Sequence, residues 1–514
     1  MIKKTVFDDL FVLDLANNHF GDIKHAKKVI DEFSKVRSNF NIKACLKFQF
    51  RNLNTFVHKS EINNKKNKYV QRFLSTRLEF NDFNKLKNFC KKKNLLTACT
   101  PFDEESIADI EKIGFDYLKI ASVSSNDWNL LERATKNNIP KIISTGGKTL
   151  EEIDKIVSFL SHKNQKFSLM HCVALYPSQN SDMQLNTIKD LIKRYKNINV
   201  GWSTHEEPEN LIPSTVALSL GATMFEKHIG IDTKKYKLNN YSTSPAQFEK
   251  YLINLSDVKS SLGKKTKIVD KNERKTLDLL DRGIFLKENI KKNTILERKN
   301  VYFAFPKKPN QISASNISFK LDKIKILNDL KKDAPINFKN VKFYERSNAS
   351  MVSTFLHKVK AQLNYNNIDL GNDFDLEISH HYGLKKFKKY GCFLFNCINR
   401  EYAKKIILMF ENQKHPLHKH KLKEETFQIL QGKLISELNG KRNILYPGDT
   451  QLVKPGVWHK FQAGPEGCIF EEVSTTHYNN DSFYQDVRIN SLPRNKRKSF
   501  FKNWGEHEIQ LNVK

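Results

Sequence analysis

The chain has 514 residues, of which 39% are hydrophobic, and its formal net charge is +31. This length predicts about two to four domains with cores of their own, and the composition excludes an intrinsically disordered chain. The basic residues are dispersed and accompany no zinc-finger, helix-turn-helix or RNA-recognition signature, so we interpret most of them as solvated surface and expect no nucleic-acid partner.

Short apolar runs alternate with segments of helical period from about residue 9 to 262. In Ile23–Val36, for example, apolar residues recur every three to four positions. About eight strand–helix units in this length are typical of an α/β fold of the (β/α)8 TIM-barrel type, which we predict over residues 1–265. A doubly wound open sheet is the alternative, but residues 16–21 lack the Gly-rich loop it would need. The predicted strands are Leu10–Leu15, Ala44–Phe48, Leu95–Ala98, Tyr117–Ile120, Lys141–Ile143, Phe167–Met170, Asn199–Gly201 and Thr223–Phe225.

Shorter β-rich segments follow the predicted barrel. Residues 263–275 are charged and contain glycine, which predicts a linker, and residues 276–345 predict a small β-rich module. A helix is expected at Val352–Leu363 in a second connector. Closely spaced β-runs over residues 376–480 predict an all-β sandwich or barrel, and residues 481–514 predict a basic tail, poorly ordered at its end.

Polar residues follow the eight predicted strands of the first domain. In a TIM barrel the C-terminal ends of the strands share one mouth, so these side chains are expected to converge. Two lysines supply positive charge and several hydroxyls supply neutral donors, which suits a small substrate with phosphate and carboxylate groups. His205 and His228 each end an apolar run and are candidates to hold one divalent metal. For any single lysine or serine a solvated surface role is the better interpretation, and the joint pattern carries the prediction.

These strand ends carry a set of short motifs. They are Asp14 with Asn18-His19, Lys47-Phe48-Gln49, Thr100-Pro101-Phe102-Asp103, Lys119-Ile120-Ala121-Ser122, Ser144-Thr145-Gly146, His171-Cys172 with Tyr176-Pro177, Ser203-Thr204-His205 and Glu226-Lys227-His228. Together they resemble the sialic acid synthase family, which condenses phosphoenolpyruvate with an N-acyl sugar aldehyde. The resemblance covers about residues 8–262 and continues into residues 276–340, which look like the family's antifreeze-like (SAF) module.

The resemblance implies a transferase that makes a nonulosonic or related 2-keto-3-deoxy sugar acid for surface polysaccharide, and a homodimer formed through the SAF module. The enolpyruvate C3 would attack the aldehyde carbon, water would add at C2, and phosphate would leave by C–O cleavage. Mn²⁺ or Mg²⁺ would polarise the aldehyde. The implied substrate-binding residues are Lys47, Gln49, Thr100, Lys119, Ser122, Ser144, Tyr176 and Ser203. The implied catalytic residues are Asp14, His205, Glu226 and His228, and both histidines would bind the metal.

Several positions depart from the family pattern. Ser124 stands where the family has an acid near the metal, the opening acid is shortened to Asp14, and Gln184 replaces an asparagine. Residues Lys237–Ser242 replace an Asp-His stretch. Phe305 replaces an SAF arginine that, in the family, contacts the N-acyl group in a partner's active site. The phosphoenolpyruvate half of the site is therefore better defined than the sugar half.

A second metal site is predicted near the C-terminus. His418 and His420 are two residues apart, so on a strand they face the same side. With Glu425 and His459 they make three imidazoles and one carboxylate, a set that suits Zn, Fe, Mn or Ni. This spacing, with Gly432 after the acid, resembles the cupin family and implies a C-terminal cupin barrel. A cupin barrel without catalysis is the alternative.

The seven cysteines form no C-x-x-C pair, and no apolar run approaches the roughly 20 residues needed to span a bilayer. Acids near the N-terminus break any signal sequence, so we expect a cytoplasmic protein without a membrane partner. The rival hypotheses are a cupin-centred sugar isomerase or epimerase, and a non-catalytic sugar- or phosphate-binding protein. The absence of an acid at Ser124 favours the second rival.

Overall fold

The computed structural model describes residues 5–263, 267–319, 322–344, 348–371 and 373–504. The chain divides into two compact units, Met1–Ile268 and Val269–Lys514, each of which is described by itself. Within the described residues, no helix is both long and apolar enough to cross a membrane.

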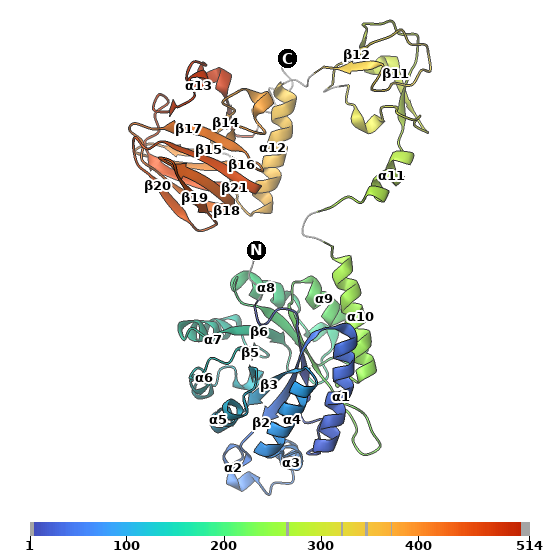
Figure 1. The fold of residues 1–514 in the computed structure, drawn as a ribbon, viewed down its shortest axis with the longest axis vertical. Helices are drawn as coiled ribbons and strands as arrows, with labels where there is room; N and C mark the ends of the chain where they lie inside the picture. The colour runs from blue at the N-terminus through green and yellow to red at the C-terminus, as the bar shows by residue number, and fades with distance from the viewer. Residues whose placement is uncertain (1–4, 264–266, 320–321, 345–347, 372, 505–514) are drawn as a thin grey trace. The chain divides into compact units, whose positions relative to one another are not determined.

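The first unit is a closed barrel of eight parallel strands in chain order (Figure 1). The strands are β1 Leu10–Asp14, β2 Lys43–Phe50, β3 Leu96–Pro101, β4 Tyr117–Ile120, β5 Lys141–Ser144, β6 Phe167–Cys172, β7 Val200–Thr204 and β8 Met224–His228. This confirms the TIM-barrel prediction. β1 lies between β2 and β8, in a register that places Asp14 beside both Lys47 and His228. The pairing of β1 with β8 therefore brings Asp14 and His228, the first and last predicted site residues of the barrel in chain order, next to each other.

Helices follow the strands and cover the outside of the barrel (Figure 1). In α1 the Asp22 side chain caps the first turn, and Ala26, Ile30 and Phe33 bury one face at helical spacing. Between β2 and β3 an insertion of about 30 residues carries the short helices α2 and α3. The helices are α1 Ile23–Phe40, α2 Leu53–Phe56, α3 Lys68–Ser75, α4 Phe80–Lys92, α5 Glu104–Ile113, α6 Trp128–Ala134, α7 Leu150–His162, α8 Asn186–Arg194, α9 Ile212–Ser219 and α10 Pro245–Ser261.

The second unit begins with a helix and a small β module. Helix α11, Lys271–Leu279, forms where a linker was predicted, because Asp270 accepts hydrogen bonds from the amides of its first turn. β9 pairs with β11, and β10, β12 and β13 form a second sheet around a core of isoleucines, leucines and valines. The strands are β9 Gly283–Leu286, β10 Ile295–Leu296, β11 Val301–Ala304, β12 Ile324–Ile326 and β13 Val341–Phe343.

The rest of the unit is an antiparallel sheet of ten strands with two apolar cores, one of which includes residues of helix α12, Asn348–Tyr365. The strands are β14 Asp375–Ser379, β15 Cys392–Asn399, β16 Tyr402–Met409, β17 Lys414–Lys419, β18 Glu425–Leu438, β19 Lys441–Leu445, β20 Thr450–Val453, β21 His459–Thr475, β22 Phe483–Tyr484 and β23 Lys498–Lys502. The short helices α13 Val487–Asn490 and α14 Arg494–Arg497 precede β23. The all-β prediction for this region is confirmed.

The predicted domain boundary at residue 480 cuts through this sheet. β22 pairs with β17, and β23 pairs with β14 over five residues. Tyr484, Ile489 and Phe501 are buried, and they anchor a segment that the sequence predicted to be a tail. The end of that tail, residues 505–514, lies outside the described residues.

Candidate active site and metal centre

The C-terminal ends of the barrel strands line a cavity of about 740 Å³. All twelve residues that the sequence proposed for the barrel site contribute to its lining. They are Asp14, Lys47, Gln49, Thr100, Lys119, Ser122, Ser144, Tyr176, Ser203, His205, Glu226 and His228. Each lies in the C-terminal half of a strand or in the loop that follows it, so the barrel geometry brings them together.

Two lysines and two carboxylates form a buried chain of ion pairs in this cavity. The Lys47 ammonium lies 2.8 Å from Asp14 Oδ2 and 2.5 Å from Glu226 Oε1. The Lys119 ammonium lies 2.8 Å from Glu226 Oε2 and donates to Ser144 Oγ at 2.5 Å. Burial alone would raise the pKa of Glu226, but the ammonium groups of Lys119 and Lys47 outweigh it and hold that pKa below its usual value. The acid is therefore ionised and fixes both cations.

His205 and His228 lie side by side, with ring centroids 5.3 Å apart. His205 Nδ1 donates to the Val173 carbonyl at 2.9 Å, which leaves Nε2 as a free base. His228 Nε2 lies 3.4 Å from Asp14 Oδ2. Burial lowers the pKa of His205 to about 3 and also lowers the pKa of His228, so both rings are neutral at pH 7. Two neutral imidazoles beside a carboxylate fit a divalent cation with positions open to a substrate.

Two tyrosines stand beside these imidazoles. The Tyr176 ring lies 4.2 Å from His205, and the Tyr241 ring lies 6.0 Å from His205 and 5.2 Å from His228. Tyr241 comes from the segment Lys237–Ser242, one of the departures from the family pattern, and sequence reasoning missed it as a site residue. Its place in the loop after β8, at the C-terminal end of the barrel, was the signal that could have identified it.

The insertion between β2 and β3 supplies further lining residues that the sequence did not predict, among them Arg51, Lys68 and Arg72. By contrast, Ser124 is buried in a short turn and does not line the cavity, and neither does Gln184. Among the residues that line the cavity, Asp14 and Glu226 are the two acids.

Phe305, which replaces the SAF arginine, lies in the second unit. It comes directly after β11 and is 60% exposed.

A second buried ion pair lies outside the cavity, between the last two strands. The Lys227 ammonium lies 2.7 Å from Glu206 Oε1, and both side chains are almost fully buried. The Tyr251 ring of α10 lies 5.2 Å from the ammonium. Glu206 is the neighbour of His205 in the chain, and Lys227 is the neighbour of His228. Side chains alternate along extended backbone, so the two histidines face the cavity while Glu206 and Lys227 face the opposite side. This ion pair therefore ties together the two strand ends that carry the imidazoles.

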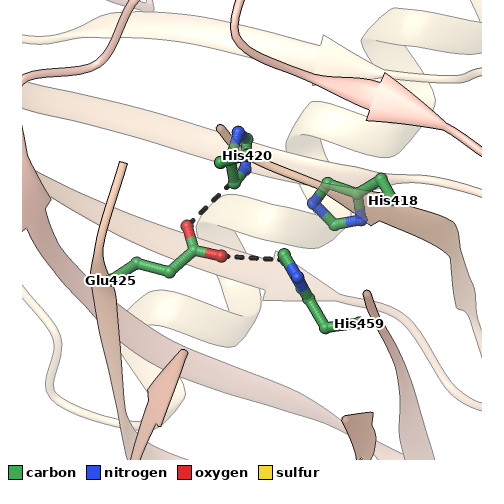
Figure 2. Close-up of side chains that lie close together, drawn as sticks. All are labelled: His418, His420, Glu425 and His459. Atoms are coloured by element: carbon green, nitrogen blue, oxygen red, sulfur yellow. Dashed lines mark ion pairs between the residues drawn. The ribbon is translucent and has the colours of Figure 1, made fainter. Parts of the chain in front are cut away.

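The second unit contains the four-residue cluster predicted near the C-terminus (Figure 2). The ligand atoms of His418, His420, Glu425 and His459 all lie within 4.8 Å of one another, and all four residues are buried. His459 Nε2 lies 2.9 Å from Glu425 Oε1, and His420 Nε2 lies 3.8 Å from Glu425 Oε2 (Figure 2). The structure thus brings together residues from β17, β18 and β21 and from the turn after β17.

The backbone orients the three rings of this cluster. The Nδ1 atoms of His418, His420 and His459 donate to the carbonyls of Pro416, Asp481 and Val457, at 3.1, 2.6 and 3.0 Å. Each Nε2 is therefore left as a base, as in metal sites whose ligands are held by outer hydrogen bonds. Burial lowers the pKa of His420 to about 4 and that of His418 well below its usual value. Neutral imidazoles and an acid fit a divalent transition metal.

Lys423 is a neighbour of this cluster that sequence reasoning missed. Its ammonium forms ion pairs with Glu425 and, at 2.9 Å, with Glu472. Burial alone would raise the pKa of Glu425, but the Lys423 ammonium outweighs it and holds that pKa well below the usual value. The carboxylate is therefore ionised before any metal binds.

Buried neutral histidines make the stability of the barrel unit depend on pH. Burial, with smaller contributions from His25 and Arg51, lowers the pKa of His19 from 6.5 to about 4. The unfolded chain takes up this proton below about pH 6.5 and the folded chain does not, so the free energy of unfolding falls as pH decreases toward 4. We expect His19 to account for up to about 3 kcal/mol of this loss. Urea denaturation at about pH 7 and pH 5 measures it. His19→Gln should flatten the dependence, and an unchanged slope would contradict the assignment.

Comparison with known proteins agrees with this geometry. A model described as the NeuB family matches residues 39–267, and a model described as a cupin domain matches residues 407–470. An uncharacterized protein of Methanocaldococcus jannaschii is 31% identical over 319 residues, which cover 62% of this chain and 89% of that protein. The N,N'-diacetyllegionaminic acid synthase of Campylobacter jejuni is 27% identical over 334 residues, which cover 63% of this chain and 96% of the synthase.

Among solved structures, a protein of Chromobacterium violaceum assigned to spore coat polysaccharide biosynthesis as protein E is similar to this chain. The two are 37% identical, with a TM-score of 0.62. The similarity covers 65% of this chain and 99% of that protein. It therefore extends beyond the barrel.

Proposed function

Because the chain belongs to the NeuB family and carries a C-terminal cupin domain, we propose that it condenses phosphoenolpyruvate with an N-acyl sugar aldehyde. The products are phosphate and a 2-keto-3-deoxy acid of the nonulosonic type, which serves surface polysaccharide synthesis. The legionaminic acid synthase among its relatives supports this chemistry. The observation that carries the proposal is the meeting of Lys47, Lys119 and two neutral imidazoles in one cavity.

Phosphoenolpyruvate carries a carboxylate and a phosphate, and the cavity offers donors for both. Lys47 and Lys119 supply fixed positive charge, and Glu226 holds the two ammonium groups in place. The hydroxyls of Thr100, Ser122, Ser144 and Ser203, with Gln49 and Tyr176, are proposed to complete the binding site. Thr100 Oγ1 is buried and has no hydrogen-bond partner among the described residues, as expected for a donor that awaits a ligand.

The reaction joins the enolpyruvate C3 to the aldehyde carbon. His205 and His228, beside Asp14, would hold Mn²⁺ or Mg²⁺, which when bound polarises the aldehyde carbonyl. Water adds at C2, and phosphate leaves when the bond between C2 and the bridging oxygen breaks. Lys47 and Lys119 are already fixed where charge grows on the departing phosphate, so they stabilise it without reorganisation.

The direct test is turnover. The full chain is incubated with Mn²⁺, phosphoenolpyruvate and a panel of N-acyl hexosamines, and the consumption of phosphoenolpyruvate and the release of phosphate are measured. We expect the two to be equal and to depend on the sugar. Binding of phosphoenolpyruvate without release of phosphate for any acceptor would instead support the non-catalytic binding protein.

The module at residues 276–345 is proposed to act as an SAF module and to form a homodimer with a second copy. Phe305 would then present an apolar ring where the family has an arginine. Phosphoenolpyruvate is an intracellular metabolite, so we place the reaction in the cytoplasm.

We propose that the cupin cluster binds one divalent transition metal, with Zn, Fe, Mn and Ni as candidates, separately from the barrel. The full chain loaded with metal should then hold about two ions, and His418→Ala or His228→Ala should each remove about one. Elemental analysis after gel filtration measures this stoichiometry. His418→Ala should leave synthase turnover intact, because its ring belongs to the other unit. If His418→Ala abolished turnover and His228→Ala did not, the cupin-centred isomerase would be favoured.

A further inference from the structure

We propose that the acceptor sugar carries a phosphate monoester, and that Arg51 binds this second anionic group in the outer part of the barrel cavity. This inference rests on the proposed function and specifies the substrate class that the same site accepts. It begins from a cation in the cavity lining that the phosphoenolpyruvate site does not use.

Arg51 follows the last residue of β2 and lies further toward the mouth than the phosphoenolpyruvate residues of that strand. Lys47 and Gln49 lie in β2, and Arg51 comes directly after its last residue. The three are spaced two apart, so in extended backbone their side chains point to one side. All three line the cavity. Lys47 and Arg51 are four residue steps apart, which in extended backbone corresponds to about 13 Å between their Cα atoms. A three-carbon ligand held by Lys47 and Lys119 leaves the Arg51 position to the other substrate.

The Arg51 guanidinium is held in position by two aromatic rings and one hydrogen bond. It lies between the rings of Phe73 and Phe102, with 4.1 and 3.7 Å from the carbon of the guanidinium to the ring centroids. One terminal nitrogen donates to Gln49 Oε1 at 3.0 Å. The two rings fix the plane of the group, which therefore loses little freedom when it binds an anion.

No carboxylate within the described ranges forms an ion pair with Arg51, and its buried Nε has no hydrogen-bond partner there. Asp103, the nearby acid, accepts hydrogen bonds from the amides of Asn52 and Ser106 and caps α5. Burial lowers the pKa of Arg51 to about 10, so the group keeps its charge at pH 7. A buried cation without an acid is costly unless a ligand supplies the negative charge.

The charge balance of the whole cavity also favours a second anionic group on the acceptor. Six lysine and arginine side chains line it, against two acids. Phosphoenolpyruvate brings about three negative charges, and a divalent cation offsets most of them. Lys237 is paired with Asp232 at 3.1 Å, but Lys68 and Arg72 add to Arg51 from the β2–β3 insertion. A neutral sugar would leave this positive excess uncompensated, whereas a phosphate monoester brings nearly two negative charges.

The test compares an N-acyl hexosamine with its 6-phosphate as acceptor. We expect the wild-type chain to show a kcat/KM about 10- to 100-fold higher with the phosphorylated sugar, measured by consumption of phosphoenolpyruvate. Arg51→Gln should abolish this preference and leave the KM for phosphoenolpyruvate unchanged, and Arg51→Lys should retain part of it. Arg77→Gln is the matched control, because Arg77 lies just after the same insertion, pairs with Glu79, and does not line this cavity. Equal use of both sugars by the wild-type chain would overturn the proposal.

A binding measurement separates this proposal from the proposed function. The sugar alcohols of the two acceptors lack the reacting aldehyde, so their affinities can be measured by calorimetry with phosphoenolpyruvate and Mn²⁺ present. Tighter binding of the phosphorylated alcohol, lost in Arg51→Gln, supports the subsite even if neither sugar is turned over. Equal affinities would refute it. An absence of turnover with both sugars, together with intact Arg51-dependent binding, would contradict the synthase activity alone.

Discussion

Replacing Lys47 by methionine should lower kcat/KM for phosphoenolpyruvate by about 1,000-fold or more. The change removes a cation from the anion site and leaves the Asp14 and Glu226 carboxylates, 2.8 and 2.5 Å from the lost ammonium, facing the substrate phosphate. Attraction thus becomes repulsion in a buried site, where charges are poorly screened. Steady-state kinetics with phosphoenolpyruvate as the varied substrate measures the effect.

Lys141→Met is the matched control for this experiment. Lys141 is also a buried lysine of the barrel, but it lies at the start of β5, and its ammonium donates to Gln165 and to the carbonyl of Ile139. It does not line the cavity. We expect its loss to reduce stability and to leave kcat/KM within about threefold of wild type. If Lys47→Met retained most of the activity, or if both variants lost it equally, Lys47 would have no specific role at the anion site.

Lys227→Met should lower the free energy of unfolding of the barrel unit by about 3–5 kcal/mol. The substitution leaves Glu206 buried without its partner, and the second oxygen of Glu206 already lacks a hydrogen bond within the described residues. The same change should weaken Mn²⁺ binding, because the pair joins the strand ends that carry His205 and His228. Urea denaturation and a Mn²⁺ titration followed by electron paramagnetic resonance measure the two effects.

A double-mutant cycle makes this prediction specific. If the pair acts as a unit, Lys227→Met combined with Glu206→Met should cost much less than the sum of the two single changes. Arg133→Met provides the comparison, because its ion pair with Glu111 is also 2.7 Å long but more exposed, and its loss should cost less than about 1 kcal/mol. Additive effects at positions 206 and 227 would show that the pair does not couple the two strands.

The sequence predicted the barrel because burial on both faces makes parallel strands apolar, but it placed most of the strand ends too early. The last strand was expected at Thr223–Phe225 and runs over Met224–His228. Glu226 and Lys227 remain in the ladder with β7, since their backbones pair whatever their side chains are. An apolar run in the sequence indicates which residues are buried among apolar groups. It does not indicate how far the backbone hydrogen bonds between neighbouring strands extend. The polar residues at these ends were nevertheless identified, because the barrel topology sends them to one mouth.

Site residues outside the strand ends were missed for different reasons. Tyr241 reaches the cavity from the loop after β8, whose path depends on tertiary packing that no periodicity records. Arg51 comes directly after β2, beyond the predicted end of that strand at Phe48. Glu206 and Lys423 were predictable in principle, because each lies one or two residues from a predicted ligand on a strand or its extension, where alternation fixes the side it faces. They were missed because the ion-pair partner of each residue is distant in the sequence. Glu206 pairs with Lys227, and Lys423 pairs with Glu472.

The fate of the oxygen that bridges C2 and phosphorus in phosphoenolpyruvate tests the central claim most directly. The bridging position is labelled with a heavy oxygen isotope, the full chain turns the compound over with Mn²⁺ and an acceptor sugar, and phosphorus NMR reads the label in the released phosphate. Water attack at C2 and C–O cleavage, at a site where two fixed lysines receive the departing phosphate, predict that all of the label leaves with phosphate. Label retained in the sugar acid would mean attack at phosphorus and would contradict the account.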